Sequence, residues 1–274
     1  MHRLLLAAGL CFGFAAHSHA ADPLQTVLAG SQRSAANSAR DAFRHPYETL
    51  NFFGLQPQMT VVELVPGAAW YTEILAPYLR SKGKLIAAGA PDPASTDAYA
   101  QRSYQRLTQK FTAAPALYDQ VISGIFQPPG KLAYAAPASV DMVLTFRNIH
   151  NWVEHGDAAV AAVFASAYES LKPGGVFGVV EHRLPEALEQ DATASSGYVH
   201  ESYVIRLAQT AGFELAARSE INANPKDLAI HEKGVWSLPP VYANKETGHA
   251  AYQAIGESDR MTLKFVKPTT PLSH

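Results

Sequence analysis

The segment MTVVELVPGAAWYTEILAPYLRSKG (59–83) decides the fold. Its first part, MTVVELVPG (59–67), is a short β-branched run that ends in Pro-Gly, and it predicts a buried strand. Apolar residues then recur at helical spacing from Trp70 to Leu79. Lys82 and Gly83 follow, as is typical of the end of a helix. A buried strand that leads directly into an amphipathic helix is the basic unit of an α/β protein.

The same alternation continues along the chain. We expect further strands at 84–90, 120–126, 139–146, 176–183, 213–221 and 261–267. Helices are expected at 22–45 (one or two), 48–55, 96–111, 157–171 and 197–212, and LKPGG (171–175) is expected to be a turn. Strands that alternate with helices predict a mostly parallel sheet, whereas the last two strands, with no clear helix between them, predict an antiparallel edge.

Composition excludes several classes of protein. The chain has 274 residues, of which 47% are hydrophobic and 17% charged, so a largely disordered chain is excluded. The formal net charge is −2, and no run of basic residues stands out, so neither nucleic acid nor an acidic membrane surface is an expected partner. The single cysteine, Cys11, excludes a disulfide scaffold and a cysteine-ligated zinc site.

The first twenty residues, MHRLLLAAGLCFGFAAHSHA, are typical of a Sec signal peptide. Arg3 supplies a positive charge, an apolar stretch too short to span a bilayer follows, and Ser18 and Ala20 are small residues before a cleavage site at Ala21. An uncleaved anchor is the alternative. We expect cleavage, a periplasmic or secreted protein, and no membrane association afterwards.

We expect the ligand-binding and catalytic residues to lie where the strands end, because ligands of open α/β sheets bind outside the carboxyl ends of the strands. This rule selects the stretches 63–72, 89–92, 146–152 and 181–183. Asp141 lies at the start of its strand instead, and we expect it to support the fold.

Three of these stretches resemble motifs of a known family. VVELVPGAAWYTEILAPYL (61–79), SVDMVLTFRNIHNW (139–152) and LKPGGVFGVVEHR (171–183) are similar to successive motifs of class I S-adenosylmethionine-dependent methyltransferases. More narrowly, the chain resembles a bacterial group of exported, predicted methyltransferases. That group also carries segments like RHPYETLNFFGL (44–55), EINANPKD (220–227), GVWSLPP (234–240) and AIGESDRMTLKFVKP (254–268).

The resemblance covers nearly all of residues 40–268 and implies a Rossmann-like fold. This fold has a seven-stranded, mostly parallel sheet with an antiparallel last strand and helices on both faces. The expected organisation is a helical extension at 21–45 and a methyltransferase-like domain at 46–268. A long insertion at 222–258 separates the last two strands and is expected to cover the crevice as a lid.

The resemblance also implies S-adenosylmethionine as the cofactor, lying across the ends of the first, second and fourth strands. Glu63 matches the acidic residue that receives the amino group of the ligand, and Gly67 matches the central glycine of the loop. Asp92 is the available acid for the ribose hydroxyls, although it could equally belong to a Pro-Asp-Pro turn. The other expected cofactor-binding residues are Pro66, Ala69, Tyr71, Thr72, Arg147 and Asn148, with packing and capping as the alternative for Tyr71 and Thr72.

The first loop departs from the family pattern. Val65 and Ala69 stand where the general motif has its first and last glycine, and Ala68 replaces a further glycine of close relatives. Each added Cβ is expected to narrow the pocket and to exclude a positive φ.

His150, Glu181 and His182 are the expected catalytic residues, since a histidine or carboxylate can act as a general base toward a methyl acceptor. The structural alternatives are a satisfied buried histidine and an Arg–Glu ion pair at the strand end that contains Arg183. A metal site built from His150, His182 and His200 is conceivable, but these histidines lack ligand spacing and no metal is expected.

Two functions from different classes follow. The first is transfer of a methyl group from S-adenosylmethionine to a small-molecule acceptor. The alternative is an exported protein with the methyltransferase fold and an altered or lost cofactor, which binds another small molecule or a protein partner. The replaced glycines favour the alternative, and so does export, because S-adenosylmethionine is made in the cytoplasm. The oligomeric state is not fixed by the sequence.

Overall fold

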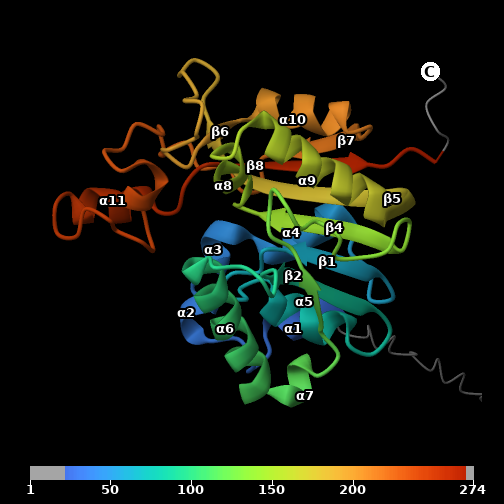
Figure 1. Ribbon diagram of the computed structural model, residues 1–274. Helices are drawn as coiled ribbons and strands as arrows, with labels where there is room; N and C mark the ends of the chain where they lie inside the picture. Colours follow the sequence, from blue (N-terminus) through green and yellow to red (C-terminus); the bar gives the residue numbers. More distant parts are fainter. Residues whose placement is uncertain (1–21, 270–274) are drawn as a thin grey trace, which may run out of the picture.

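The computed structural model describes residues 22–269 (Figure 1). The expected signal peptide and Cys11 lie outside the described residues, so export remains a prediction. Across residues 22–269, none of the helices combines the length and the apolar character that crossing a membrane requires.

A mixed β-sheet forms the centre of the molecule. Its strands run in the order β3-β2-β1-β4-β5-β8-β7, and the short β6 pairs with β5 alone. β3, β2, β1, β4 and β5 are parallel, whereas β8 is antiparallel to both β5 and β7. The strand bounds are β1 Thr60–Leu64, β2 Lys84–Ala90, β3 Ile122–Ile125, β4 Val140–Phe146, β5 Leu171–Leu184, β6 Val199–His200, β7 Glu214–Ser219 and β8 Arg260–Val266. The expected parallel sheet with an antiparallel last strand is confirmed.

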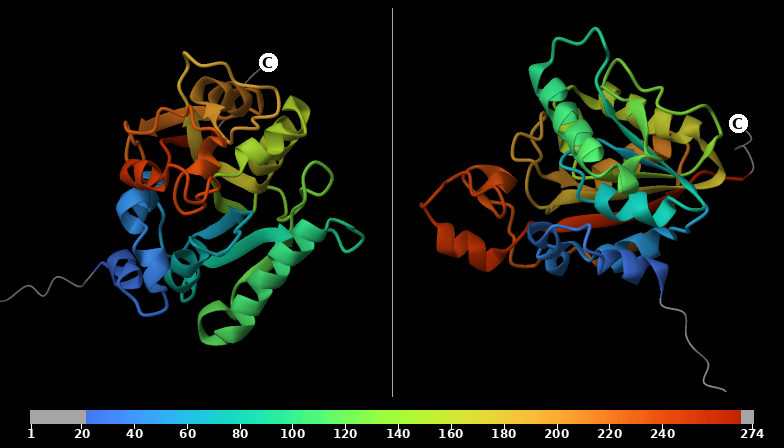
Figure 2. Two further views of the ribbon diagram at one scale, coloured as in Figure 1. Left: turned by 90° about the vertical axis from the view of Figure 1, so that its left-hand side faces the viewer. Right: turned by 90° about the horizontal axis from the view of Figure 1, so that it is seen from below.

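The helices cover both faces of this sheet, as expected (Figures 1 and 2). One apolar cluster joins the sheet to Trp152, Phe164 and Leu207, and the opposite cluster joins it to Phe53 and Ile74. The helices are α1 Pro23–Leu28, α2 Ala35–Ser38, α3 Asp41–Arg44, α4 Pro46–Phe53, α5 Thr72–Leu79, α6 Ala98–Ala113, α7 Pro115–Tyr118, α8 Ile149–Val153, α9 Asp157–Ser170, α10 Glu201–Thr210 and α11 His249–Ile255.

The fold differs from expectation in several places. Three helices, α1, α2 and α3, lie where one or two were expected, and α7 and β6 were not expected. The polar stretch after β4, where no helix was expected, contains α8, and a carboxylate of β5 accepts hydrogen bonds from the first backbone N–H groups of this helix. The expected turn at 171–175 lies inside β5: Leu171 pairs with Val140, and the ladder resumes at Val176 after a register shift. Turn residues are thus accommodated as a bulge within the strand.

The role expected for Asp141 is confirmed. Its Oδ2 accepts a hydrogen bond of 2.8 Å from the backbone N–H of Thr60, and its Oδ1 lies 2.7 Å from Nζ of Lys172. The carboxylate therefore joins the starts of β1, β4 and β5, at the sheet edge opposite the candidate site.

The long connection at 222–258 carries structure of its own. It contains a 3₁₀ turn, η1 Gly234–Ser237, and α11, which lies in a lobe that projects from the body of the molecule (Figures 1 and 2). The order of the sheet reverses between β1 and β4, and this switch point is where open α/β sheets form their ligand crevice.

Candidate functional site

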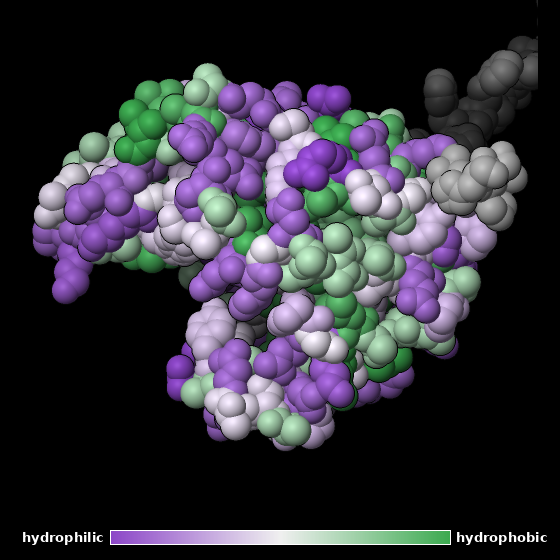
Figure 3. Space-filling view, turned by 45° about the horizontal axis from the view of Figure 1, so that its top comes forward, coloured by the Kyte–Doolittle hydropathy of each residue, from purple (hydrophilic) through white to green (hydrophobic). Residues whose placement is uncertain are grey.

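The carboxyl ends of the parallel strands face the side of the molecule that carries α11 and α3 (Figure 1). On this side the surface is hollowed between the lobe that contains α11 and the part of the molecule below it (Figure 3). Several of the expected site residues come from loops at this edge of the sheet.

The β1–α5 loop keeps the backbone of a glycine-rich loop although two of its glycine positions are filled. Val65 has φ 48°, Gly67 has φ 57° and Ala69 has φ 64°. The expectation that Val65 and Ala69 exclude a positive φ is therefore wrong. Backbone hydrogen bonds of 2.8 Å from the N–H of Val65 to Ala88 and 2.9 Å from the N–H of Ala69 to Pro66 oppose the strain that a Cβ brings to this conformation.

Two glycines shape the loop in different ways. At Gly67, a Cβ would meet no described atom within 4 Å, so the backbone there faces open space. At Gly89, at the end of β2, a Cβ would lie 2.9 Å from Cδ of Pro66. The bare backbone of Gly89 thus lets the loop lie directly against β2, and the bare backbone of Gly67 leaves room for a ligand.

Glu63 lies at the end of β1 and is 3% exposed. Its Oε2 accepts a hydrogen bond of 2.6 Å from the hydroxyl of Thr72 in the first turn of α5. Burial raises the pKa of Glu63 to about 7, against the opposing effects of the Thr72 hydrogen bond and the charge of Arg147. The carboxyl group is therefore poised between its two protonation states near neutral pH.

Asn148 joins the two strands at the switch point. Its Nδ2 donates to the carbonyl of Leu64 at 3.1 Å and to the hydroxyl of Thr145 at 3.3 Å. Arg147, the preceding residue, has a positive φ of 60°, and its backbone N–H donates to Val180 at 2.7 Å. Asn148 thus holds the ends of β1 and β4 together. Arg147 lines a separate cavity, which His182 also lines.

Tyr71 is packed inside the protein and not along an open wall. It is 3% exposed, and its ring stacks on Phe146 with centroids 3.5 Å apart and planes at 9°. Trp70 packs edge-on against Tyr71, and the guanidinium of Arg44 lies 4.6 Å from the Trp70 ring centroid. This arrangement supports the packing interpretation for Tyr71 and attaches α3 to the β1–α5 loop.

Asp92 forms the turn that was the alternative to a ribose contact. Its Oδ1 accepts from the N–H of Ala94 at 3.0 Å, and its Oδ2 lies 3.3 Å from Nζ of Lys131. The hydrogen bond from Ala94 and the contact with Lys131 lower the pKa of Asp92. The residue lines an open hollow with Gln127, beyond the end of β2.

The three expected catalytic residues come together. Nδ1 of His150 lies 3.0 Å from Oε1 of Glu181, and the rings of His150 and His182 have centroids 5.4 Å apart. Nδ1 of His182 lies 2.5 Å from the hydroxyl of Ser258. Burial, and then the positive charges of His150 and Arg147, lower the pKa of His182 well below its usual value. His182 is therefore a neutral imidazole with its Nδ1 already engaged.

Glu181 anchors the start of α8. Its Oε2 accepts from the N–H of Ile149 at 2.5 Å, and its Oε1 accepts from the N–H of His182 at 2.8 Å. Because Glu181 also faces Nδ1 of His150, this carboxylate fixes the position of both histidines. It is fully buried, and these hydrogen bonds compensate its desolvation.

Each of His150, Glu181 and His182 has one potential ligand atom within 4.8 Å of those of the other two. The three side chains could therefore hold a metal ion together. His200 is outside this group, since its Nε2 lies 2.9 Å from the carbonyl of Leu188. Two observations oppose a cation here. The Glu181 oxygens already accept backbone hydrogen bonds, and the nearby guanidinium of Arg147 repels a second positive charge.

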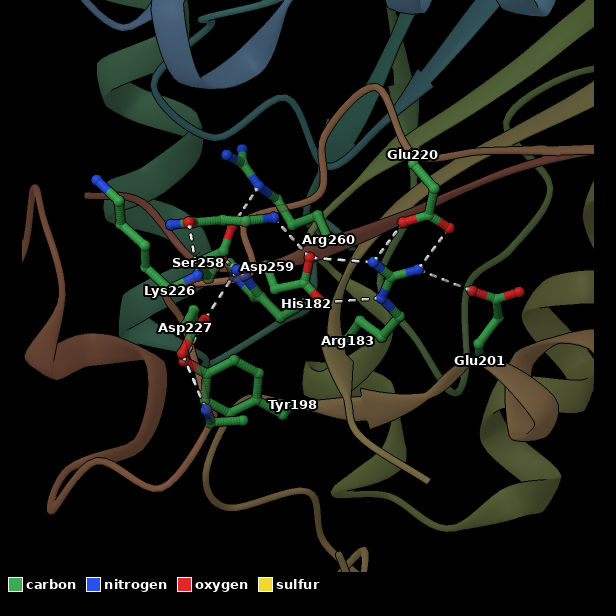
Figure 4. A network of polar contacts seen from close by, with 12 residues as sticks. His182, Arg183, Tyr198, Glu201, Glu220, Lys226, Asp227, Ser258, Asp259 and Arg260 are labelled. Carbon is green, nitrogen blue, oxygen red and sulfur yellow. Dashed lines mark hydrogen bonds and ion pairs between the residues drawn. The ribbon is translucent and has the colours of Figure 1, made fainter. Parts of the chain in front are cut away.

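Arg183 pairs with carboxylates other than Glu181. Its Nε lies 2.8 Å from Asp259, its Nη2 lies 2.7 Å from Glu220, and its Nη1 lies 3.4 Å from Glu201 (Figure 4). Asp259 also receives the backbone N–H of Asn224 at 2.7 Å. Glu220 and Asp259 flank the 222–258 connection, so these ion pairs hold its two ends against the end of β5.

The sequence did not indicate four further arginine and glutamate residues at this edge. Arg40, Arg44 and Arg260 surround the carboxylate of Glu257, and Arg40 and Arg44 line a cavity of about 200 Å³ with Arg147 and His182. The other wall of this cavity is formed by η1 and the residues after it, which agrees with a covering role for the 222–258 connection. The only sequence signal was the presence of Arg44, Glu257 and Arg260 in the family-like segments 44–55 and 254–268, and Arg40 lies outside both.

Comparison with known proteins identifies the fold. No family model and no curated protein matches the sequence. Among solved structures, an S-adenosylmethionine-dependent methyltransferase from Aquifex aeolicus matches with a TM-score of 0.55 at 14% identity, over 84% of this chain and 93% of that one. The [4+2]-cyclase SpnF matches with a TM-score of 0.59 at 14% identity, over 90% and 92% of the two chains.

A possible exported protein from Bordetella parapertussis also matches, with a TM-score of 0.50 at 13% identity, over 89% of this chain and 78% of that one. At such low identities, the likeness shows the fold alone. The expected fold of class I S-adenosylmethionine-dependent methyltransferases is confirmed, and the reaction has to be argued from the site, because one fold serves many reactions.

Proposed function

We propose that this protein transfers a methyl group from S-adenosylmethionine to a small-molecule acceptor. The observation that carries the proposal is the β1–α5 loop, where Val65, Gly67 and Ala69 all keep a left-handed backbone. The loop thus retains the shape of a glycine-rich nucleotide loop without most of the glycines. Glu63 stands at its start, where a carboxylate can receive the ammonium group of the cofactor.

The residues at the switch point fit such a ligand. Gly67 leaves open space beside the loop, and Asn148 and Thr72 hold the groups around it in place. S-Adenosylmethionine would supply an electrophilic methyl group there. The contribution of the chain is to align the acceptor with that methyl group and to exclude water, which supplies most of the rate in such a displacement.

His182 is the residue that we assign to proton removal from the acceptor. Its low pKa keeps it neutral, its Nδ1 faces Ser258, and it lines the cavity beside Arg147. Nε2 of His182 is then the atom that can accept a proton. Glu181 and His150 act as positioning residues, because the carboxylate fixes the backbone of both histidines.

A second function is favoured by one observation. Glu63 already accepts a hydrogen bond from Thr72, and its pKa of about 7 makes it half protonated at neutral pH, which weakens its attraction for a cationic cofactor. The alternative is therefore a protein with the methyltransferase fold that binds an uncharged or anionic small molecule, or a protein partner, at the same edge of the sheet.

Export is part of the proposal. It rests on the signal-like sequence of residues 1–20 and on the likeness to the possible exported protein from Bordetella parapertussis. N-terminal sequencing of the protein from a periplasmic or culture fraction tests it. Processing at or near Ala21 is expected, and an intact Met1 on the exported protein would contradict cleavage.

The test of the reaction is transfer of a labelled methyl group. The purified protein is incubated with S-adenosylmethionine labelled in its methyl group and a protein-free small-molecule extract. We expect a labelled product with the natural protein and a strong loss with His182→Gln, while Arg80→Gln, which alters an exposed ion pair with Asp119, retains transfer. Equal label in the presence and absence of the protein would contradict methyl transfer.

A further inference from the structure

The cavity next to His182 contains an unusual excess of positive charge. Arg40, Arg44 and Arg147 line it, and the buried Arg260 contacts Glu257, which is also part of the lining. These residues come from the N-terminal helices, the end of β4 and the start of β8, which the fold brings to one place. Four guanidinium groups in a largely buried environment repel one another unless anions lie between them.

One carboxylate, Glu257, neutralises part of this charge. Its Oε1 lies 2.6 Å from Nε of Arg40, and its Oε2 lies 3.1 Å from Nε of Arg44 and 3.3 Å from Nη1 of Arg260. Although burial opposes ionisation, the charges of Arg44 and Arg260 lower the pKa of Glu257 to about 2. Glu257 is thus fully ionised, and its two oxygens are already shared among three arginines.

Two of the arginines keep donors without partners. Arg44 is 3% exposed, and its Nη1 is buried without a hydrogen-bond acceptor among the described residues. In the part of the chain that the structure describes, the guanidinium of Arg147 makes neither a hydrogen bond nor an ion pair, and the charges that affect it most are those of Arg260 and Glu257. Burial, reinforced by the neighbouring arginines, lowers the pKa of Arg44 to about 9 and that of Arg147 to about 10.

A buried donor without a partner, such as Nη1 of Arg44, is costly in the free protein, and an anion bound between Arg44 and the unpaired guanidinium of Arg147 would satisfy it. Arginine presents its N–H groups as a planar fork that matches the two oxygens of a carboxylate or phosphate. The cavity of about 200 Å³ is smaller than the roughly 300–1,000 Å³ of sites that enclose a whole drug-sized ligand. It therefore fits one end of a ligand better than a complete one.

We propose that the arginine cluster of Arg40, Arg44 and Arg147 binds the carboxylate or phosphate group of an anionic methyl acceptor. This inference rests on the proposed methyl transfer. The anionic end would lie between Arg44 and Arg147, and the remainder of the acceptor would extend toward His182 on the same cavity wall. Trp236, Pro239 and Pro240 of the covering connection close the opposite side.

The test measures anion binding without any methyl transfer. Inorganic phosphate and malonate are titrated separately into the purified protein by calorimetry in a low-salt buffer free of other multivalent anions. We expect binding of at least one of them, and the stronger of the two identifies the acceptor group as phosphate or carboxylate. Arg147→Gln should weaken this binding by about tenfold or more, since each charge-assisted hydrogen bond contributes roughly 1.5–3 kcal/mol.

Two matched variants make the result specific. Arg147→Lys keeps the charge without the planar fork and should bind with intermediate affinity. Arg80→Gln removes one positive charge at an exposed ion pair with Asp119 and should bind anions like the natural protein. Failure of both anions to bind, or equal weakening by Arg147→Gln and Arg80→Gln, would overturn the inference.

A parallel titration with S-adenosylmethionine separates this inference from the proposed function. If S-adenosylmethionine binds and the anions do not, the anionic acceptor is wrong while methyl transfer stands. If the anions bind with the expected dependence on Arg147 and S-adenosylmethionine does not, the arginine cluster is an anion site and methyl transfer is wrong.

Discussion

The hydroxyl of Thr72 lies 2.6 Å from Oε2 of Glu63 and joins the first turn of α5 to the end of β1. This contact lies at the base of the loop that carries the cofactor proposal. A carboxyl group so deeply buried has a pKa of about 7, and this makes both the stability of the protein and its ligand affinity dependent on pH.

The first prediction concerns stability. The pKa of Glu63 is raised on folding from 4.5 to about 7, so its stabilising effect is complete below pH 4.5 and is lost as the pH rises through 7. The natural protein thereby loses roughly 3 kcal/mol of its free energy of unfolding. Glu63→Gln should therefore become more stable relative to the natural protein between pH 5 and pH 8. Urea denaturation at both pH values measures this, and parallel profiles would contradict it.

Glu257 should behave in the opposite way. Its pKa is lowered on folding from 4.5 to about 2, so its stabilising effect is present above pH 4.5 and is lost as the pH falls toward 2. The free energy of unfolding of Glu257→Gln should be lower than that of the natural protein by roughly 3 kcal/mol at pH 7 and by less at pH 3. The exposed Glu48→Gln on α4 serves as the control and should change little. A loss for Glu257→Gln that is the same at both pH values would show that ionisation is not its cause.

Gly67→Val tests the cofactor loop against a matched glycine. Gly67 and Gly156 both have a positive φ, and neither has a described atom within 4 Å of an added Cβ. Valine should strain either position by about 1–3 kcal/mol, since both lie at a positive φ that side chains disfavour. Gly67→Val should abolish binding of S-adenosylmethionine in a calorimetric titration, whereas Gly156→Val, before α9, should retain it. Equal affinities of the two variants would place the ligand elsewhere.

Arg183 should contribute strongly to stability. It makes ion pairs with Asp259, Glu220 and Glu201, and its side chain is 20% exposed. Arg183→Ala leaves Asp259, whose side chain is 16% exposed, without its ion pair and removes one of the two cationic partners of Glu201, at a cost of about 2–4 kcal/mol in the free energy of unfolding. Arg218→Ala, whose exposed side chain also contacts Glu201, should cost below about 1 kcal/mol. Chemical denaturation measures both, and similar losses would contradict the assignment.

The sequence predicted the sheet because its signals are local. Each apolar run between turn residues became a strand. The sequence carries no clear helical pattern between the last two strands, and this indicated the antiparallel direction of β8 even though the short helix α11 lies there. His150, Glu181 and His182 also lie together, as their positions after or at the carboxyl ends of neighbouring strands had indicated. Strand ends of a parallel sheet meet at one edge, so a one-dimensional pattern suffices to bring such residues together.

The arginine cluster could not be predicted in this way. Arg44, Arg147 and Arg260 come from three distant segments, and none lies in a run of basic residues. The positive φ of Val65 was also missed, because steric preference argues against it. Hydrogen bonds to the end of β2 override that preference in the folded protein.

The central claim is that the β1–α5 loop binds S-adenosylmethionine, and calorimetric titration of the purified protein tests it most directly. The titration is made at pH 8, where Glu63 is mostly ionised, with S-adenosylmethionine and separately with S-adenosylhomocysteine. We predict binding of both ligands, with a weaker affinity at pH 6. Absence of binding at millimolar concentrations of both ligands would contradict the account.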